Sequence, residues 1–434
     1  MKIKDIHAIQ ILSSRGYPTI RTKVILDDDS FGIADVPSGA SKGKNEALEL
    51  IDKDENVYRG LSVYKAINNI NKVICKSLKG MDISTSLVAD LKLNSLDSTE
   101  QKSKLGANAI LSTSIAIAKA LAKSNKMELF QSLDEIKNIY SLPVPMLNII
   151  NGGMHASNNI DIQEFMILPV GADSFSDAIR MASEIYMSLK GKLSSKNLLG
   201  GVGDEGGFAP NLGSDEEALD LIMDSIKDAG YIPGKDVLIS LDVAASSWKV
   251  ENEDLYVFPK SKKQFTTDEL IRFYEQLIYK YPIFSIEDGL DETDYSGWIK
   301  FNQLLKDKLV LIGDDLYVTN YNLLKRGIDE NWSNGILIKP NQIGTVTETI
   351  TTINLAKENN FIYIVSHRSG DTSDSFISDL AVAKNALLIK AGAPCRSERV
   401  EKYNRLLEIE DMYETEYNGK KISKIFSSFS SYRF

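Results

Sequence analysis

The sequence predicts an α/β protein, an eight-stranded TIM-like barrel with an N-terminal α+β capping domain. Three observations support this fold class. Eight short apolar runs of strand length follow one another in the C-terminal two-thirds of the chain, and helical sequence separates the last six. Each of those six ends in a charged or titratable side chain, at the face where such barrels carry their active sites. The N-terminal third differs, because it begins with an antiparallel strand pattern.

The capping domain is expected over residues 1–138. Three runs with strand character come first, and the polar run 27–30 favours a hairpin turn between the last two. Residues 108–123 form the clearest helical pattern, because alanine and isoleucine dominate and glycine and proline are absent. The predicted strands are 3–11, 19–26 and 31–36.

The barrel is expected over residues 139–434. Pro143 and Pro145 interrupt helical sequence and favour an extended segment, which marks the boundary between the two domains. The last six predicted strands end, in order, in three acids, a lysine, a histidine and a lysine. The eight predicted barrel strands are 146–150, 164–168, 238–242, 283–288, 310–315, 336–339, 362–367 and 387–390.

Composition excludes several classes of function. The chain has 434 residues, 43% of them hydrophobic, which is enough for two domains with sizeable cores. The net charge is −10 and basic residues do not cluster, so no nucleic-acid binding is expected. No run approaches the roughly 20 apolar residues that cross a bilayer, and no signal-peptide apolar region opens the chain, so we expect a cytoplasmic protein without a membrane span. Cys75 and Cys395 have no motif spacing and are expected to be free thiols.

Three acidic side chains end successive predicted barrel strands. Asp242, Glu287 and Asp314 should therefore meet over one mouth of the barrel. Three carboxylates share a small space only if a cation compensates them or if they take up protons. Oxygen ligands without histidine or cysteine favour a hard divalent ion such as Mg²⁺ over zinc. The alternative is that each acid caps the helix after its strand.

Two lysines end later strands and are expected at the same mouth. Lys339 precedes Pro340, which keeps the lysine backbone extended. Close to a metal ion and to Lys390, Lys339 should have its charged form disfavoured, as a general base at neutral pH requires. The alternative is a lysine that extends to solvent or pairs with an acid.

The run 200–208 combines glycines with two acids. It contains a G-x-G-x-x-G string, but it follows no convincing strand, Pro210 blocks an immediate helix, and acids would repel a pyrophosphate. A dinucleotide site is therefore excluded. We interpret the run as a loop that holds Asp204 and Glu205 near the mouth, with Glu205 a candidate acid opposite Lys339. A plain flexible loop is the alternative.

Donors for an anionic group are suggested at two places. His367 ends a predicted strand and is followed by Arg368 and Ser369, which suit a phosphate or a carboxylate, while His155 lies in a second distinctive string. The small, hydroxylated run 37–43 is either an ordinary surface turn or a mobile lid that brings hydroxyls and backbone donors onto a phosphate and a second metal ion.

Taken together, these strings resemble the enolase family over almost the whole chain. Each string alone has low specificity, but their joint presence in this order is highly specific. Gly289 and Leu290 are similar to the bacterial branch. The resemblance rests on 14–19, 37–41, 151–153 with His155, 163–165, 203–208, 285–288, 313–316, Lys339 with 341–344, 366–370 and 396–399.

The resemblance implies a reaction and a role for each site residue. Enolases interconvert 2-phosphoglycerate with phosphoenolpyruvate and water, in glycolysis and gluconeogenesis, with two Mg²⁺ per active site. Lys339 would be the general base that removes the proton beside the substrate carboxylate, and Glu205 the general acid that helps the hydroxide to leave. The first Mg²⁺ would be bound by Asp242, Glu287 and Asp314, the second by Ser41, and the substrate by His155, Gln163, Glu164, His367, Arg368, Ser369 and Lys390.

The resemblance also implies an enolase-type barrel, in which the first strands are atypical. It implies a homodimer or a higher oligomer built from dimers. A cytoplasmic location is expected, and bacterial relatives allow a surface or secreted pool as well.

Several positions depart from the family pattern. Lys42 stands where lids usually carry threonine, and it adds a cation beside the expected phosphate and second metal. Met154 replaces a small residue and Asp371 a glutamate. At Arg21 and Glu408 the family more often has an acid and an arginine that pair across the dimer interface. We therefore hypothesise the same ion pair with its polarity reversed.

Two other functions are compatible with the sequence. One is another Mg²⁺-dependent dehydratase or racemase of the enolase superfamily that acts on a sugar acid, although the 37–43 and 366–369 strings favour a phosphorylated substrate. The other is a protein that keeps the fold for a non-catalytic binding role. Loss of the lysine base or of a metal carboxylate would indicate that role, yet all of these residues are present.

Overall fold

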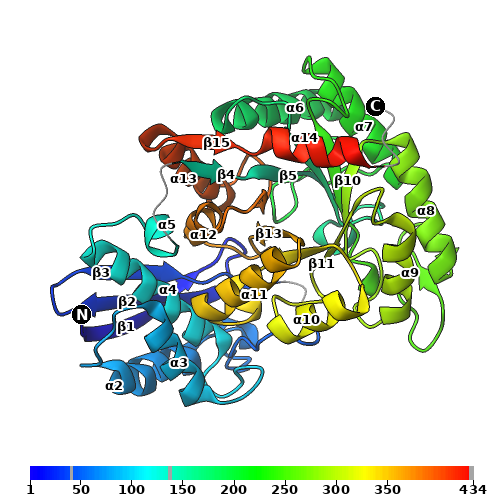
Figure 1. Ribbon diagram of the computed structural model, residues 1–434. Helices are drawn as coiled ribbons and strands as arrows, with labels where there is room; N and C mark the ends of the chain where they lie inside the picture. Colours follow the sequence, from blue (N-terminus) through cyan, green and yellow to red (C-terminus); the bar gives the residue numbers. More distant parts are fainter. Residues whose placement is uncertain (40–42, 135–138, 430–434) are drawn as a thin grey trace.

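The computed structural model describes residues 1–39, 43–134 and 139–429, which form a small α+β domain and a closed barrel (Figure 1). The first domain contains an antiparallel sheet in the order β1 (Ile3–Leu12), β2 (Pro18–Leu26) and β3 (Phe31–Asp35). Helix α4 (Ala107–Ser124) packs on this sheet and is buried along most of its length. The predicted sheet, hairpin turn and helix are confirmed.

Short helices complete the first domain. They surround α4 and the inner face of the sheet, so that isoleucine, leucine and alanine side chains from all of them share one core. The elements are η1 (Tyr58–Gly60), α1 (Tyr64–Asn68), the π-helical turn η2 (Asn69–Ile74), α2 (Cys75–Leu78), α3 (Ser86–Asp97) and α5 (Leu129–Ser132).

Eight strands close the barrel, as predicted. Around the barrel they are β5 (Val144–Asn151), β6 (Glu164–Leu168), β7 (Leu238–Asp242), β10 (Ile283–Glu287), β11 (Val310–Gly313), β12 (Gly335–Ile338), β13 (Ile362–Ser366) and β14 (Leu388–Lys390). The first strands are atypical, because β6 runs antiparallel to both β5 and β7 while the other neighbours are parallel. The start of β6 therefore lies at the mouth where the other strands end, and Glu164 pairs in register with Asp242.

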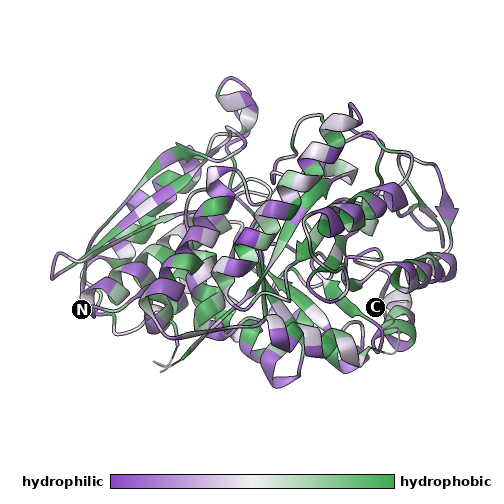
Figure 2. Ribbon diagram, turned by 90° about the horizontal axis from the view of Figure 1, so that it is seen from above, coloured by the Kyte–Doolittle hydropathy of each residue, from purple (hydrophilic) through white to green (hydrophobic). Residues whose placement is uncertain are grey.

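Helices surround the barrel, with apolar residues toward the strands and polar residues outward (Figures 1 and 2). This pattern follows from the need to cover the outer face of a closed, mostly parallel barrel. The helices are α6 (Phe175–Ser195), α7 (Asp215–Asp228), α8 (Thr267–Lys280), α9 (Tyr295–Leu305), α10 (Tyr321–Glu330), α11 (Val346–Glu358), α12 (Phe376–Lys384) and α13 (Ser397–Met412).

One end of the barrel is filled by an apolar cluster. Ile422 and Phe426 of helix α14 (Gly419–Ser428) pack there against residues such as Leu238, from the barrel interior. Two-stranded pairs lie outside the barrel, β4 (Tyr140–Leu142) with β15 (Thr415–Tyr417), and β8 (Tyr256–Val257) with β9 (Gln264–Phe265). The opposite end, where most strands finish, carries the polar residues.

Short helical turns η3 (Gly153–His155), η4 (Ala245–Ser247) and η5 (Pro340–Gln342) follow three barrel strands at the polar end. The first domain meets this end through its loops, since Ser38 exchanges two backbone hydrogen bonds with Gly370. The boundary after residue 138 stays a prediction, because residues 135–138 lie outside the described ranges.

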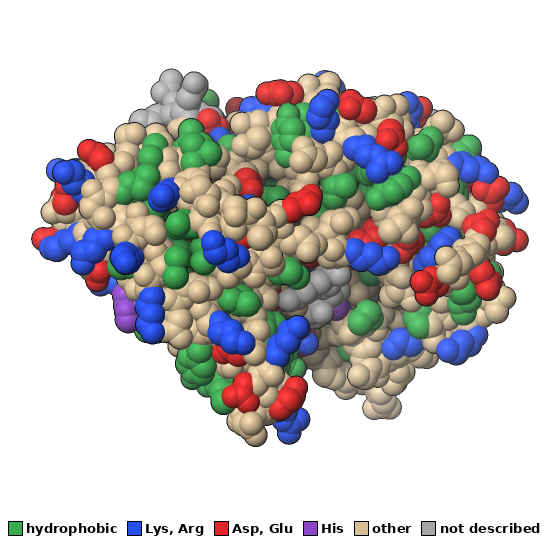
Figure 3. Space-filling model, turned by 90° about the horizontal axis from the view of Figure 1, so that it is seen from below, with side chains coloured by type: hydrophobic (Ala, Val, Ile, Leu, Met, Phe, Trp, Pro, Cys, Tyr) green, Lys and Arg blue, Asp and Glu red, His purple; other side chains and the backbone are tan. Residues whose placement is uncertain are grey.

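The surface carries charges of both signs. Figure 3 shows lysine and arginine side chains interspersed with acids over one face of the described molecule. Among the described residues, no helix combines the length and the apolar character that crossing a membrane requires.

Candidate active site

A cavity of about 270 Å³ lies at the polar end of the barrel. The structure gathers nearly all the sequence-predicted site residues there. Glu287 lies just beneath the lining, with 1% of its surface exposed, and Ser41 lies outside the described residues. The predicted residues that line the cavity are His155, Gln163, Glu164, Glu205, Asp242, Asp314, Lys339, His367, Arg368, Ser369 and Lys390.

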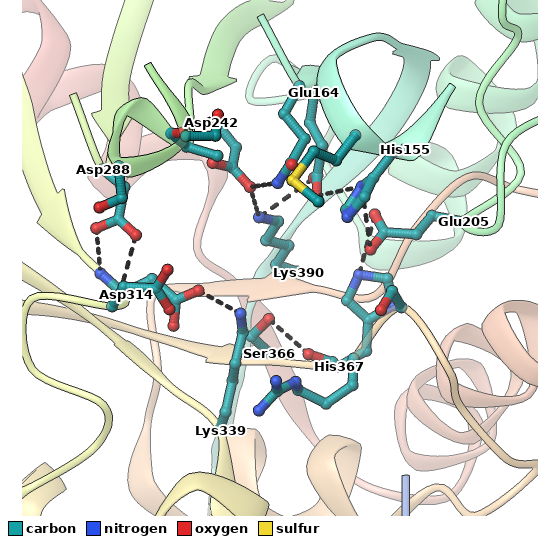
Figure 4. Close-up of a pocket in the computed structure, with 18 of the residues that line it drawn as sticks. His155, Glu164, Glu205, Asp242, Asp288, Asp314, Lys339, Ser366, His367 and Lys390 are labelled. Carbon is teal, nitrogen blue, oxygen red and sulfur yellow. Dashed lines mark hydrogen bonds and ion pairs between the residues drawn. The ribbon is translucent and has the colours of Figure 1, made fainter. Parts of the chain in front are cut away.

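Lys390 lies at the centre of the site (Figure 4). Its ammonium group is 2.8 Å from Glu287, 3.1 Å from Asp242 and 3.2 Å from Glu164. Burial alone would lower the pKa of Lys390, but the surrounding carboxylates outweigh burial and raise the pKa well above its ordinary value. Lys390 is therefore a permanent positive charge beneath the cavity.

Lys339, just beyond the end of β12, forms an ion pair with Asp314. Burial lowers the pKa of Lys339, but the Asp314 charge outweighs burial and the net shift is upward. The expectation of a disfavoured charged form concerned a lysine close to a metal ion and stays a prediction for the metal-bound site. Pairing with an acid, the alternative weighed from the sequence, is what the structure shows.

Asp288 and Asp314 lie beside this lysine, on the left of Figure 4. Together with Asp315 they form a group of close acids that we call the acid side. Asp288 has a positive φ of 45°, and its two carboxylate oxygens accept the backbone N–H groups of Asp314 and Asp315 at 2.8 and 2.9 Å. Burial and the neighbouring charges raise the pKa of Asp288 well above its ordinary value, and burial with the Asp314 charge raises the pKa of Asp315 to about 8. The acid side thus has more carboxyl groups than Lys339 compensates, and in the absence of a further cation their protonated forms are favoured.

The donors in this part of the cavity fit a divalent cation. Asp242, Glu287 and Asp314 offer only carboxylate oxygens, the ligands that Mg²⁺ prefers. Burial and the Asp242 charge raise the pKa of Glu287 to about 8, so an added cation would be favoured here. These three are more widely spaced than Asp288, Asp314 and Asp315, whose ligating atoms lie within 4.8 Å of one another, because Lys390 stands between Asp242 and Glu287.

A second group, on the right of Figure 4, we call the histidine side: His155, Glu164, Glu205 and His367. His155 Nδ1 lies 3.5 Å from Glu164 and 3.9 Å from Glu205. His367 Nε2 lies 3.5 Å from Glu205, whose carboxylate also accepts a 3.1 Å hydrogen bond from Asn148. Burial and the Glu205 charge raise the pKa of Glu164 well above its ordinary value. Burial and the neighbouring negative charge therefore favour the protonated form of Glu164.

The glycine run 200–208 brings Glu205 into the cavity, as interpreted from the sequence. Asp204 points elsewhere, because its carboxylate pairs at 3.0 Å with Arg15 of the first domain. Gly206, with φ of 90°, fits closely beside Cys395, and an added Cβ would lie 2.8 Å from its Sγ. Gln163 binds Asp242 at 3.3 Å.

Arg368 is buried against the first domain. Its guanidinium donates to Glu46 at 3.0 and 3.2 Å and to Asn341 at 3.3 Å. Gly39 must lack a side chain here, because an added Cβ would lie 1.8 Å from Arg368 Nη2. Glu46 also accepts from Gln342, which in turn donates to Asp314 at 2.9 Å. This network joins the first domain to both the arginine and the acid side.

The structure adds residues that sequence reasoning did not single out. Asp288 and Asp315 belonged to predicted strand ends, so the strand-end rule could have found them. Glu46 and Asn148 come from a loop and an early strand, and no local pattern marks them, while Arg399 lies in the 396–399 string, to which no site role was assigned. Their places depend on packing between distant segments.

The fold and the site define an α/β-barrel protein with an N-terminal α+β cap and an acid-lined, lysine-bearing mouth. Comparison with protein families gives two matches. The model described as enolase, C-terminal TIM barrel domain, matches residues 139–426, and the enolase N-terminal domain matches residues 3–133. The two matches cover nearly the whole chain, and the chain belongs to the enolase family.

Proposed function

We propose that the protein catalyses the reversible, Mg²⁺-dependent dehydration of 2-phosphoglycerate to phosphoenolpyruvate, with two Mg²⁺ per active site. One observation carries the proposal. One cavity contains a lysine beside carboxylates of the kind that bind Mg²⁺, two neighbouring glutamates of which Glu164 has a raised pKa, and an arginine–serine pair. These groups match the three demands of the substrate, namely a proton beside a carboxylate, a hydroxyl that must leave and a phosphate.

Removal of the first proton is the difficult step, because a carbon beside a carboxylate is a very weak acid. When bound by Asp242, Glu287 and Asp314, Mg²⁺ supplies positive charge against the substrate carboxylate and the charge that develops on it. Lys339 would take the proton at Nζ. Since Nζ must be neutral to accept a proton, its ion pair with Asp314 must be broken in the active form.

Departure of the hydroxide needs a proton from the opposite side of the cavity. Glu205 would give it after taking it from Glu164, because burial and the Glu205 charge raise the pKa of Glu164 well above its ordinary value while the pKa of Glu205 is lowered. Arg368 and Ser369 would hold the phosphate, and Lys390 would balance the carboxylates beneath the substrate. Burial of these groups excludes water and strengthens each electrostatic contact.

The decisive assay is formation of phosphoenolpyruvate from 2-phosphoglycerate, with and without Mg²⁺. Lys339→Ala should lower kcat by about 10²- to 10⁴-fold. Lys102→Ala is a matched control, because Lys102 is a buried lysine paired at 2.8 Å with Glu348, away from the cavity lining. No activity in the parent, or equal rates in parent and Lys339→Ala, would reject the proposal.

We also propose that the protein works as a cytoplasmic homodimer and that Ser41 reaches the second Mg²⁺. Both proposals rest on the membership of this chain in the enolase family. Calorimetric titration of Mg²⁺ into the protein with 2-phosphoglycerate present should give two ions per chain, and one ion with Ser41→Ala. A single ion in the parent would reject the second site.

A further inference from the structure

Arg399 lies fully buried in the first turn of α13, behind the histidine side. Its guanidinium contacts groups on both loops that carry predicted site residues. Nη1 lies 2.6 Å from His367 Nδ1 and donates to the carbonyl of Arg368 at 2.5 Å. Nη2 donates to the carbonyl of Ser369 at 2.6 Å and to that of Asp204 at 3.2 Å. All four Nη hydrogens thus have acceptors.

The space around this guanidinium fits an arginine closely. Gly392, at φ of 89°, leaves room for the side chain, because an added Cβ would lie 2.8 Å from Arg399 Cδ. Acids balance the buried charge, since Asp371 lies 3.6 Å from Nη1 and Glu398 lies 3.4 Å from Nε. Arg399 therefore has a formed, charge-compensated place in the fold.

The contact with His367 determines where the imidazole carries its proton. A guanidinium can only donate, so Nδ1 must be the acceptor, and the ring is neutral with its hydrogen on Nε2. Nε2 lies 3.5 Å from Glu205 Oε2 and has no hydrogen-bond partner among the described residues. The charged groups that face the ring are Glu205, Arg399 and Asp371. Burial, helped by the Arg399 charge, lowers the pKa of His367 to about 4, which agrees with a neutral ring.

We propose that Arg399 is a positioning residue of the active site. By donating to His367 Nδ1 it keeps this imidazole neutral and directs the Nε2–H into the cavity toward Glu205. The same guanidinium fixes the Glu205 loop against the Arg368–Ser369 loop. The catalytic consequence rests on the proposed function, because it concerns the proton that Glu205 delivers.

The ring can be observed directly, because the chain has three histidines. Protein labelled with ¹⁵N-histidine is examined by long-range ¹H–¹⁵N NMR from about pH 5 to 8, where an unperturbed histidine titrates. His367→Gln assigns the signal. We expect the parent His367 to show an unprotonated Nδ1 and a protonated Nε2 throughout, and Arg399→Met to gain a proton on Nδ1 within this range.

Arg399→Lys keeps the charge but cannot reach four acceptors, and it covers the case in which Arg399→Met fails to fold. Arg405→Lys is the matched control, since Arg405 is on the same helix and pairs with Glu128 and Asp379 instead. Its spectrum should equal that of the parent. A parent His367 that carries its proton on Nδ1 or titrates within the range would overturn the proposal. So would parent-like His367 signals in the folded Arg399 variants.

Kinetics supply the second readout. Arg399→Lys should lower kcat by about 10- to 100-fold, the usual cost of losing a partner that orients a functional histidine. The acidic limb of its kcat/KM profile should move to higher pH, which a loss of packing alone would not cause. An unchanged profile would overturn the catalytic part. A parent without activity on 2-phosphoglycerate would reject the proposed function, while the NMR result would still decide the role of Arg399.

Discussion

The acid side and the histidine side of the cavity compensate neighbouring buried carboxylates in different ways. Both bury carboxylates close together, and ligating atoms within each group lie within 4.8 Å of one another. On the acid side the positive charge of Lys339 compensates only Asp314, and the pKa of Asp315 rises to about 8. On the histidine side the neutral His367 ring faces Glu205, and burial with the Glu205 charge raises the pKa of Glu164.

The difference separates two kinds of chemistry within one cavity. A group of acids short of positive charge is suited to receive a cation, because the cation removes the cost of burying like charges together. A pair of glutamates among hydrogen-bond donors is suited to hold and release a proton. Lys390 lies between the two sides, 3.2 Å from Glu164 of the histidine side and 3.1 Å from Asp242.

The largest expected effect comes from Glu205→Gln, which removes the acid but keeps the shape of the side chain. We expect kcat on 2-phosphoglycerate to fall by about 10²- to 10⁴-fold. Affinity for Mg²⁺, measured by calorimetry without substrate, should stay within about twofold of the parent if the two sides act separately. Weaker Mg²⁺ binding in Glu205→Gln would show that both sides contribute to one metal site, and it would contradict separate roles for the two sides.

Asp314→Asn tests the acid side. Mutation of a residue that hydrogen-bonds a metal ligand typically weakens metal binding by about 10- to 100-fold. Loss of a ligand itself should therefore raise the Mg²⁺ dissociation constant by at least about 100-fold. The variant also leaves Lys339 without its ion-pair partner. Calorimetry under the conditions used for Glu205→Gln measures the Mg²⁺ dissociation constant, so that the two variants can be compared. Parent-like affinity would assign the metal to other carboxylates, such as Asp288 and Asp315.

Strand direction made part of this site predictable. Asp242 and Lys390 occupy the last positions of β7 and β14, so a period-two strand that ends at the mouth places them there. Glu164 does not follow that rule, because β6 runs the other way and presents its first residue. Only the family resemblance identified Glu164 from sequence.

Pairing between side chains was less predictable than their location. Lys339 was expected near the acids, but its ion pair with Asp314 depends on how two strand ends approach in three dimensions. Asp288 points its carboxylate at two backbone N–H groups through a positive φ, which no local residue pattern indicates. Arg399 reaches His367 from the start of a helix that follows β14. Such contacts arise from tertiary packing.

Asp215 offers a smaller test, on a buried acid that supports the histidine side from outside the cavity. Its carboxylate accepts the backbone N–H groups of Asp161 and Ile162 at 2.9 and 3.0 Å, in the segment between His155 and Gln163. Burial, with the Asp161 charge, raises the pKa of Asp215 from 3.8 to about 6. As pH rises through about 4 to 6, the unfolded chain releases this proton before the folded chain does, so the free energy of unfolding falls.

Asp215→Asn keeps an acceptor for both N–H groups and cannot ionise. At about 1.36 kcal/mol per pKa unit, we expect this variant to be more stable than the parent by up to about 3 kcal/mol at pH 7, and equal to it near pH 4. Denaturant unfolding at the two pH values measures the difference. A stability difference independent of pH would show that Asp215 is ionised in the folded protein.

The smallest expected effect concerns charged residues on the surface, where an ion pair contributes least to the free energy of association. The hypothesis from the sequence is an ion pair between Arg21 and Glu408 across a dimer interface. Within the chain, Arg21 already donates two 2.6 Å hydrogen bonds to Asp35, and Glu408 lies 3.3 Å from Arg405. Exposed ion pairs contribute about 0.2–1 kcal/mol, so reversing one charge should change the dimer dissociation constant only a few-fold.

The comparison of Arg21→Glu with the double variant Arg21→Glu/Glu408→Arg tests the cross-interface contact, with Glu408→Arg alone as the control for the lost contact with Arg405. Both variants place a glutamate beside Asp35, so the cost of that repulsion is common to them and cancels. If the pair exists, Arg21→Glu alone should weaken association more than the double variant does, as measured by sedimentation over a dilution series. Equal weakening would mean that Arg21 acts only through Asp35 of its own chain, the contact that the structure already contains.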